Sequence, residues 1–263
     1  MTPFARLVER VHRRRHDGVV RHRADVMGTP TAWVERAPEG PPTAPALVLV
    51  PGLSMSWRAY QWLLEHLPRD RVVVAVDPPA SGRTGRPQRG LDADAQAAHV
   101  AALLHHLGIR GADVVGHSLG ALTVARLAGS RPHLVRRVVL VGPSPDPHLP
   151  HARDHLRALV GDARRERPRV LVQAATDYVR ASPALLPAFV AQIGTSATEL
   201  MAGVVAPTTV LRGGRDAVAG RRWCADLAAA VEDGRSLVLP GGTHGLPQHD
   251  PADLAAVLHD VLR

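Results

Sequence analysis

Apolar residues in the middle of the chain gather into short continuous runs that alternate with stretches of helical spacing. The runs are ALVLV (46–50), RVVVAV (71–76), ADVVG (112–116), VRRVVLV (135–141), TTVLRG (208–213) and GRSLVLP (234–240). Continuous runs of this length are typical of strands that are covered on both faces. Between and after them, apolar residues recur every three or four positions, which predicts helices over 56–67, 92–108, 119–132, 221–234 and 250–263. This alternation predicts an α/β fold, a mostly parallel twisted central sheet flanked by helices.

The N-terminal part of the chain has two other patterns. Residues 19–37 alternate around the turn sequence Met-Gly-Thr-Pro, which predicts a β-hairpin. In residues 1–17, apolar side chains recur at helical spacing among arginines, which predicts a short basic amphipathic helix. Such a helix can lie on a membrane surface, or it can pack on or trail from the main body. We therefore expect the sheet domain to span 18–143 and 208–263.

One segment breaks the strand–helix rhythm. Residues 144–207, called the insert below, have helical patterns divided by prolines and no convincing strand. They precede the penultimate predicted strand. We expect the insert to form a helical lid, or cap, over the carboxyl edge of the sheet, where open parallel sheets bind ligands.

Composition and charge narrow the class of protein. Hydrophobic residues make up 45% of the 263 residues and charged residues 21%, as in a globular protein. All 32 basic residues are arginine, and the formal net charge is +8. Outside the N-terminus the arginines are interleaved with acidic residues, which favours a solvated surface over a nucleic-acid site. The chain has neither the apolar segment of a signal peptide nor one long enough to span a bilayer, so we expect a cytoplasmic protein without stable membrane insertion.

The single cysteine, Cys224, excludes a disulfide framework and any site that needs several cysteine ligands. It lies on the apolar face of a predicted helix, so we expect it to be an unreactive residue of the hydrophobic core. We expect no metal site.

The only Gly-x-Ser-x-Gly sequence runs from Gly116 to Gly120, between a predicted buried strand and a predicted helix. Strand, tight turn and helix are the context that a nucleophile elbow requires, with Ser118 at its tip. Glycines suit both flanks because a Cβ there would collide with neighbouring backbone. The sequence therefore predicts Ser118 as a nucleophile.

A serine hydroxyl needs a base and the base needs a carboxylate. Of fifteen histidines, His244 lies in a loop just after the last predicted strand, and His249 is the alternative. His117, next to the serine, is expected to point away from it. Asp216 directly follows the penultimate predicted strand, and Asp146 is the alternative. We expect Ser118, His244 and Asp216 to form a catalytic triad.

An oxyanion hole needs two hydrogen-bond donors near the nucleophile. One is expected to be the backbone N–H of Leu119, directly after the serine at a helix N-terminus. The other is expected from the loop after the first apolar run, as the N–H of Leu53, which follows the flexible Gly52.

Together these segments resemble the α/β-hydrolase superfamily, and specifically its small, lid-bearing bacterial serine hydrolases. The resemblance rests on LVLVPG, DPPASGRTGRP, VVGHSLGA, VLRGGRD and PGGTHGLPQHDP, which occur in the family's order from about residue 20 to the end. It implies the triad above, an acyl-enzyme mechanism and no cofactor. It also implies that the insert shapes substrate choice and that Asp77 and Arg83 are structural. Where the family commonly has His-Gly, this chain has Pro51-Gly52.

We therefore expect an enzyme, a serine hydrolase that acts on a small-molecule carboxylic ester, lactone or thioester. Four insert residues are candidates for lining an acyl pocket, although packing of the insert on the sheet domain would also explain them: Leu156, Tyr178, Leu186 and Phe189. A non-hydrolytic role of the same fold, as a ligand receptor or a natural-product tailoring or cyclising enzyme, stays open. The sequence does not identify the oligomeric state.

Overall fold

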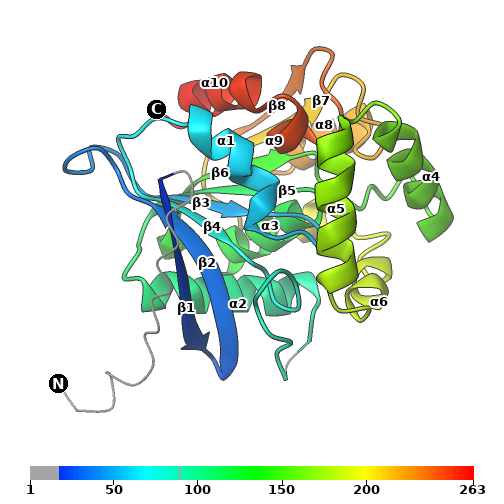
Figure 1. Cartoon of the computed structure of the whole chain (residues 1–263). Helices are drawn as coiled ribbons and strands as arrows, with labels where there is room; N and C mark the ends of the chain where they lie inside the picture. The colour runs from blue at the N-terminus through cyan, green and yellow to red at the C-terminus, as the bar shows by residue number, and fades with distance from the viewer. Residues whose placement is uncertain (1–17, 89) are drawn as a thin grey trace.

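The computed structural model describes residues 18–88 and 90–263, and in this part of the chain eight strands form one sheet (Figure 1). The amphipathic helix predicted over 1–17 lies outside the described residues. The strands are β1 (Val19–Val26), β2 (Thr29–Arg36), β3 (Leu47–Val50), β4 (Val73–Val76), β5 (Ala112–His117), β6 (Val135–Val141), β7 (Thr208–Gly213) and β8 (Gly234–Leu239).

The order of the strands across the sheet is β1-β2-β4-β3-β5-β6-β7-β8. Strand β2 is antiparallel to both its neighbours, and every pair from β4 to β8 is parallel. The predicted hairpin and the mostly parallel sheet are therefore confirmed.

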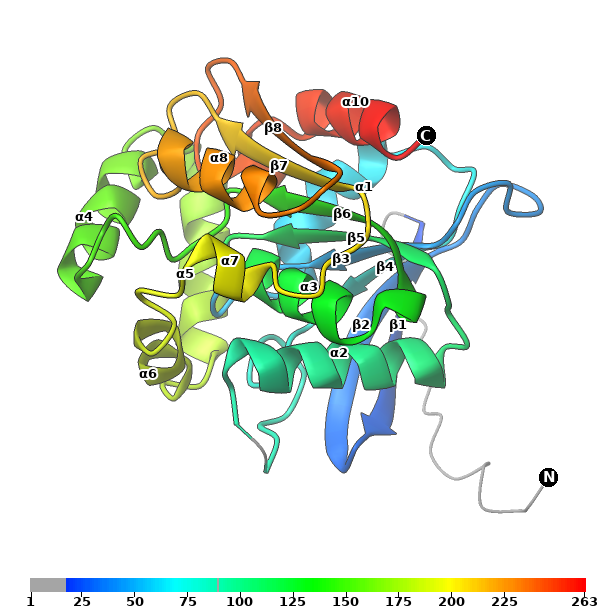
Figure 2. The ribbon, with the colours of Figure 1, turned by 180° about the vertical axis from the view of Figure 1, so that it is seen from behind.

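Helices cover both faces of the sheet (Figures 1 and 2). Those of the sheet domain are α1 (Gln61–His66), α2 (Ala93–His106), α3 (Leu119–Ser130), α8 (Arg221–Ala229), α9 (Leu246–His249) and α10 (Pro251–Val261), with 3-10 turns at Trp57–Tyr60 and Pro132–Leu134. Helices α2, α3 and α8 pack on one face, and α1 and α10 pack on the other. Within the described ranges, no helix is long and apolar enough to cross a membrane.

The two-sided cover explains the continuous apolar runs. In β3, Val48 and Val50 belong to the core under α2 and α3, whereas Leu47 and Leu49 belong to the core under α1 and α10. Successive side chains point to opposite faces of a strand, so a strand buried on both sides needs an apolar residue at every position. Cys224 is fully buried in the first of these cores, and burial raises the pKa of its thiol to about 12.

Strand β8 differs from the prediction of burial on both faces, because all of its residues are partly or fully exposed. It lies at the edge of the sheet and pairs with β7 alone. Its apolar residues therefore cover the sheet edge rather than fill the centre.

The insert contains helices and no strand along its whole described length. The helices are α4 (Ala152–Ala163), α5 (Pro168–Arg180), α6 (Leu185–Val190) and α7 (Ala197–Leu200). Helices α4, α5 and α6 gather on the side toward which the parallel strands point (Figure 2).

Helices α4 and α5 bury mostly polar side chains and expose apolar ones. The buried residues are His155 and Asp162 on α4 and Val170, Gln173 and Asp177 on α5. The exposed ones include Leu156, Leu159 and Val160 on α4 and Leu171, Val172 and Val179 on α5. This arrangement reverses that of an ordinary surface helix, whose apolar stripe faces the core.

Candidate active site

Ser118 lies at the turn between β5 and α3. Its backbone has φ 55° and ψ −124°, a left-handed conformation that a residue with a side chain rarely adopts. Such a conformation costs on the order of 1–3 kcal/mol, so the surroundings must hold it. The N–H of Ser118 donates to the carbonyl of Val141 at 2.9 Å, and its own carbonyl accepts from Ala121 at 3.0 Å. The turn presents a half-buried hydroxyl at the carboxyl edge of the sheet.

The two glycines of the motif are required by close backbone contacts. A Cβ on Gly116 would lie 2.3 Å from the carbonyl oxygen of Gly120, and one on Gly120 would lie 2.3 Å from that of Val50. Only glycine lets β3, β5 and the start of α3 approach so closely. This is the geometry expected of a nucleophile elbow.

A chain of hydrogen bonds runs from Ser118 through His244 to Asp216. The Oγ of Ser118 is 3.1 Å from Nε2 of His244, and Nδ1 of the same ring is 3.1 and 3.2 Å from the two carboxylate oxygens of Asp216. Because Nδ1 faces a carboxylate, it carries the proton of the neutral ring and Nε2 is left to accept one. The structure therefore brings together the three residues that the sequence singled out.

The carboxylate is itself fixed. One oxygen of Asp216 accepts from the N–H groups of Val218 and Ala219 at 2.8 and 2.9 Å. Burial acts to raise the pKa of Asp216, but the facing His244 and these two N–H groups outweigh it and hold the pKa below its ordinary value. Asp216 is therefore an anion beside the imidazole.

The pKa of the His244 imidazole shifts in the opposite direction to that of Asp216. Burial acts to lower the pKa of His244, but the charge and hydrogen bond of Asp216, with smaller contributions from Asp162 and Glu166, raise it above its ordinary value. These carboxylates stabilise the imidazolium, which makes the ring a stronger base toward Ser118.

The alternative residues of the sequence analysis are engaged elsewhere. His249 places Nδ1 3.0 Å from Glu166, and Asp146 accepts from His148 and from the N–H of Gly220. Neither contacts His244 or Ser118 by a hydrogen bond within the described residues.

His117 contacts the backbone of His244 rather than the serine hydroxyl. Its Nε2 lies 2.9 Å from the carbonyl oxygen of His244, and the two rings are 5.1 Å apart. Burial lowers the pKa of His117 to about 3. The ring is therefore neutral and must carry its proton on Nε2, because a carbonyl oxygen can only accept.

The loop that carries Leu53 lies against the nucleophile. A Cβ on Gly52 would be 2.9 Å from Cβ and 3.4 Å from Oγ of Ser118, so only glycine fits there. Leu53 follows it and is partly buried, and Leu119 is the first residue of α3. Their role as oxyanion donors stays a prediction.

Asp77 and Arg83 belong to a second loop, after β4, that is hydrogen-bonded to the segment following Leu53. The carboxylate of Asp77 accepts from the N–H of Trp57 at 2.8 Å and from that of Arg83 at 2.9 Å. Burial raises the pKa of Asp77 to about 6. These bonds tie two loops together, as expected of structural residues.

The four candidate lining residues of the insert fall into two groups. Phe189 is buried and meets the ring of His155 edge-on, with centroids 5.6 Å apart. Leu156, Leu186 and Tyr178 are exposed, by 60%, 60% and 44%. Their contact with a substrate stays a prediction.

Sequence reasoning missed three acidic residues of the insert that bond to the loops of the site. Asp162 accepts from the N–H of His244, Glu166 accepts from Thr243, and Asp177 accepts from Ser56. The available signal was a helical repeat of polar residues at 155 and 162 and at 173 and 177, opposite an apolar stripe. The usual rule that the apolar stripe faces inward hides that signal.

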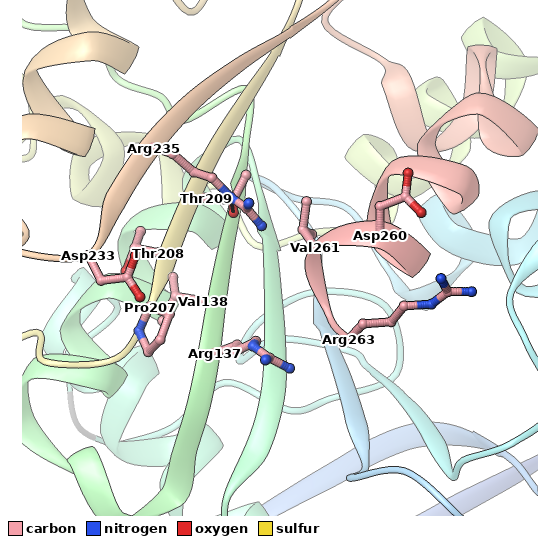
Figure 3. Close-up of a pocket in the computed structure, with 10 residues that line it drawn as sticks. All are labelled: Arg137, Val138, Pro207, Thr208, Thr209, Asp233, Arg235, Asp260, Val261 and Arg263. Atoms are coloured by element: carbon pink, nitrogen blue, oxygen red, sulfur yellow. Dashed lines mark hydrogen bonds between the residues drawn. The ribbon is translucent and has the colours of Figure 1, made fainter.

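A hollow of about 300 Å³ lies at the opposite edge of the sheet, where β6, β7 and β8 begin and α10 ends (Figure 3). All three of its arginines are already bound, Arg137 to the carbonyl of Leu262, Arg235 to the hydroxyl of Thr209 and Arg263 to the ring of His259. The other charged residues there are Asp233 and Asp260. This mixed-charge hollow is separate from the candidate site.

Two relatives illustrate what the sequence is similar to. One is the dihydrolipoyllysine-residue acetyltransferase component of an acetoin cleaving system from Pseudomonas putida, with 33% identity over 126 residues. This match covers 47% of this chain and 33% of that protein. The other is 2-hydroxy-6-oxo-2,4-heptadienoate hydrolase of Pseudomonas putida F1, with 35% identity over 94 residues. This match covers 35% of this chain and 33% of that protein. The chain thus spans about a third of the length of these relatives.

Solved structures match over nearly the whole chain. The enol-lactonase from Burkholderia xenovorans LB400 superposes with a TM-score of 0.74 at 21% identity, over 91% of this chain and 99% of that one. An esterase from Thermogutta terrifontis superposes with a TM-score of 0.72 at 18% identity, over 92% and 99%. At identities this low, the superpositions show a shared fold and nothing further.

The family pattern agrees with the sheet order and the elbow. The sequence signature described as the alpha/beta hydrolase fold matches residues 45–176, half of the chain, from β3 through the serine turn to α5. The chain therefore belongs to the α/β hydrolase fold family.

Proposed function

We propose that this protein is a serine hydrolase that cleaves a carboxylic ester, lactone or thioester of a small molecule through an acyl-enzyme intermediate. The observation that carries the proposal is the continuous hydrogen-bond chain Asp216–His244–Ser118 at a strained turn. Such a chain converts a weakly nucleophilic hydroxyl into an attacking group. Membership of the family and relatives named as a hydrolase, a lactonase and an esterase support hydrolysis.

In the first half-reaction, Oγ of Ser118 attacks the carbonyl carbon and its proton passes to Nε2 of His244. The carbonyl π electrons move to oxygen, and the N–H groups of Leu53 and Leu119 bind the resulting oxyanion. When the intermediate collapses, the leaving alcohol or thiol takes the proton from Nε2. Asp216 keeps the ring oriented and stabilises its charged form.

In the second half-reaction, a water molecule gives its proton to Nε2 and attacks the acyl carbon of the ester on Ser118. Collapse of this intermediate releases the carboxylic acid and returns the proton to Oγ. For a lactone, the alcohol and the acid are parts of one opened product. This chemistry needs no group beyond those of the chain.

The candidate lining residues give the acyl side of the proposal a test. Leu156→Gln and Leu186→Gln are expected to raise KM for nitrophenyl esters of six to eight carbons about tenfold and to leave KM for the acetate unchanged, because only a longer chain reaches them. Initial rates across a series of chain lengths measure this. An equal change for all chain lengths would show that these residues do not line an acyl pocket.

A fluorophosphonate probe tests the nucleophile. We expect one covalent adduct per chain, located on Ser118 by peptide mass spectrometry, and none on Ser118→Ala. The His244→Ala variant should label at least about a thousandfold more slowly, because the base is missing. Folded wild-type protein that does not label would overturn the proposal.

Turnover separates hydrolysis from the non-hydrolytic alternative. Steady release of nitrophenol from a short-chain ester, lost in Ser118→Ala, is the result expected of a hydrolase. Labelling by the probe without turnover of any ester, lactone or thioester would favour a receptor or a tailoring enzyme that keeps the triad.

A further inference from the structure

The insert holds the backbone of the proposed base. The carboxylate of Asp162, near the end of α4, accepts the N–H of His244 at 2.7 Å. On the other side of the same residue, Nε2 of His117 binds its carbonyl oxygen at 2.9 Å. Both backbone polar groups of His244 are therefore fixed, one by the insert and one by β5.

A second carboxylate of the insert spans the same loop. Glu166, in the turn after α4, accepts the hydroxyl of Thr243 at 2.6 Å and lies 3.0 Å from Nδ1 of His249. A Cβ on Gly245 would come within 2.8 Å of the Glu166 carboxylate, which shows how closely the side chain follows the loop. The loop is held before and after His244.

A third carboxylate of the insert holds the proposed oxyanion loop. Asp177 on α5 accepts both the N–H and the hydroxyl of Ser56, at 3.1 and 2.8 Å, and binds Arg58 at 3.2 Å. Ser56 follows Met55, whose N–H closes the loop onto the carbonyl of Gly52. The segment that contains Leu53 is thus anchored to α5.

Asp162 and Asp177 place buried carboxylates at positions where a neutral hydrogen-bond acceptor would satisfy the same N–H groups. Asp162 and Asp177 are each only 1% exposed, and one carboxylate oxygen of Asp162 has no partner within the described residues. Burying a carboxylate is unfavourable even when it is hydrogen-bonded, and a neutral acceptor such as asparagine would carry a smaller desolvation cost there. Buried polar groups that are not explained by stability point to function.

We propose that the insert is a fixed part of the active-site scaffold, in which Asp162 positions His244 and Asp177 positions the oxyanion loop. The inference rests on the proposed function, because it gives these contacts a reaction to serve. It assigns the insert a part in the chemistry itself, in addition to any contact with substrate.

Several charged or titratable groups face His244 from the elements packed around it: Asp216 after β7, His117 at the end of β5, Asp162 on α4, Glu166 after α4, and His249 on α9 through Glu166. Of these, Asp216 binds the ring and Asp162 binds the backbone. The two carboxylates can therefore be tested separately, because a change at Asp162 leaves the ring's own partner in place.

The first experiment compares Asp162→Ala and Asp162→Asn, with Asp154→Asn as a control, because Asp154 lies in the first turn of α4 and pairs with Arg157 at 3.5 Å. We expect Asp162→Ala to lower kcat for a nitrophenyl acetate about tenfold to a hundredfold with little change in KM, because a small displacement of the base is enough for such a loss. Asp162→Asn keeps an acceptor for the N–H of His244 but loses the charge. It should retain most of kcat at high pH and shift the acidic limb of the pH profile to lower pH. Asp154→Asn should match the wild type.

The second experiment concerns Asp177→Asn, with Arg180→Gln, which is exposed on the same helix, as its control. Asp177→Asn should lower kcat about tenfold at every pH and leave the midpoint of the acidic limb unchanged, because the oxyanion loop does not titrate. Circular dichroism and thermal unfolding show which variants fold. If Asp162→Ala does not fold, the asparagine variants are sufficient for the test.

The outcomes separate this inference from the proposed function. If the wild type neither labels with a fluorophosphonate nor turns over an ester, the proposed function fails. If the wild type is active and folded Asp162 and Asp177 variants keep its kcat and pH profile, or change only KM, the insert does not position the catalytic groups and this inference is overturned.

Discussion

At the scale of single residues, the serine turn depends on the absence of side chains at its flanks. A Cβ on Gly116 would collide with the carbonyl of Gly120, whereas a Cβ on Gly161, inside α4, meets nothing within 4 Å. We expect Gly116→Ala to lower the free energy of unfolding by about 3 kcal/mol. Gly161→Ala should raise it by about 0.5–1 kcal/mol, because alanine favours a helix. Urea denaturation measures both, and equal effects would contradict the described packing.

The pKa of His244 predicts how activity depends on pH. The neutral ring is the form that accepts the proton of Ser118, and its pKa lies above 6.5 because Asp216 stabilises the charged form. We therefore expect kcat/KM to fall as pH drops, with a midpoint above 6.5. Asp216→Asn should lower kcat about 10⁴-fold and move this midpoint to lower pH. A midpoint that stays in place in the variant would show that another group controls the limb.

At the scale of elements, the exposed apolar faces of the insert helices predict that apolar residues there can be replaced by polar ones with little change in the free energy of unfolding. On α5, Val179 is 87% exposed and Val170 is 4% exposed. Val179→Gln should change the free energy of unfolding by less than about 0.5 kcal/mol, and Val170→Ala should cost about 2 kcal/mol. The opposite ranking in urea denaturation would place the apolar stripe of α5 against the sheet domain.

The same elements show how far sequence reasoning reaches. Period and turn chemistry predict the hairpin β1–β2, the central parallel strands and the helices of the insert, because these features depend on local spacing. They do not show that β8 is exposed at the sheet edge, since that depends on its having one neighbour. The short helix α9 is also missed, because four residues around a proline carry no periodicity.

The residues of the candidate site also fall into those that the sequence predicts and those that it does not. Ser118, Asp216 and His244 could be picked out because each follows a strand, and the ends of parallel strands meet at one edge of the sheet. Asp162 and Asp177 could not, because their partners lie 82 and 121 positions away and no local pattern links them.

At the scale of the whole molecule, a buried neutral histidine makes stability depend on pH. Burial lowers the pKa of His117 from 6.5 to about 3, so below pH 6.5 the unfolded chain binds a proton that the folded chain does not. The stability due to the neutral ring is complete above pH 6.5 and is lost as pH falls toward 3. Between pH 7 and pH 5 this loss is about 2 kcal/mol.

Unfolding in urea at pH 7 and pH 5 checks this expectation. His117→Gln cannot titrate and should lose less stability than the wild type between these pH values, whereas His151→Gln, at an exposed site, should lose as much. If His117→Gln loses as much as the wild type, other groups account for the pH dependence.

The bonds between the insert and the two loops also bear on how such a protein can evolve. A recombination event that exchanged residues 144–207 for the corresponding segment of a distant homologue would remove the acceptors for the N–H groups of Ser56 and His244. The incoming segment would be tolerated only if it brought acceptors of its own. Substitution of single exposed side chains such as Leu156 and Val179 meets no such barrier to folding, because neither side chain holds a loop of the site. New specificities in this lineage should therefore arise by point substitution more readily than by exchange of whole segments.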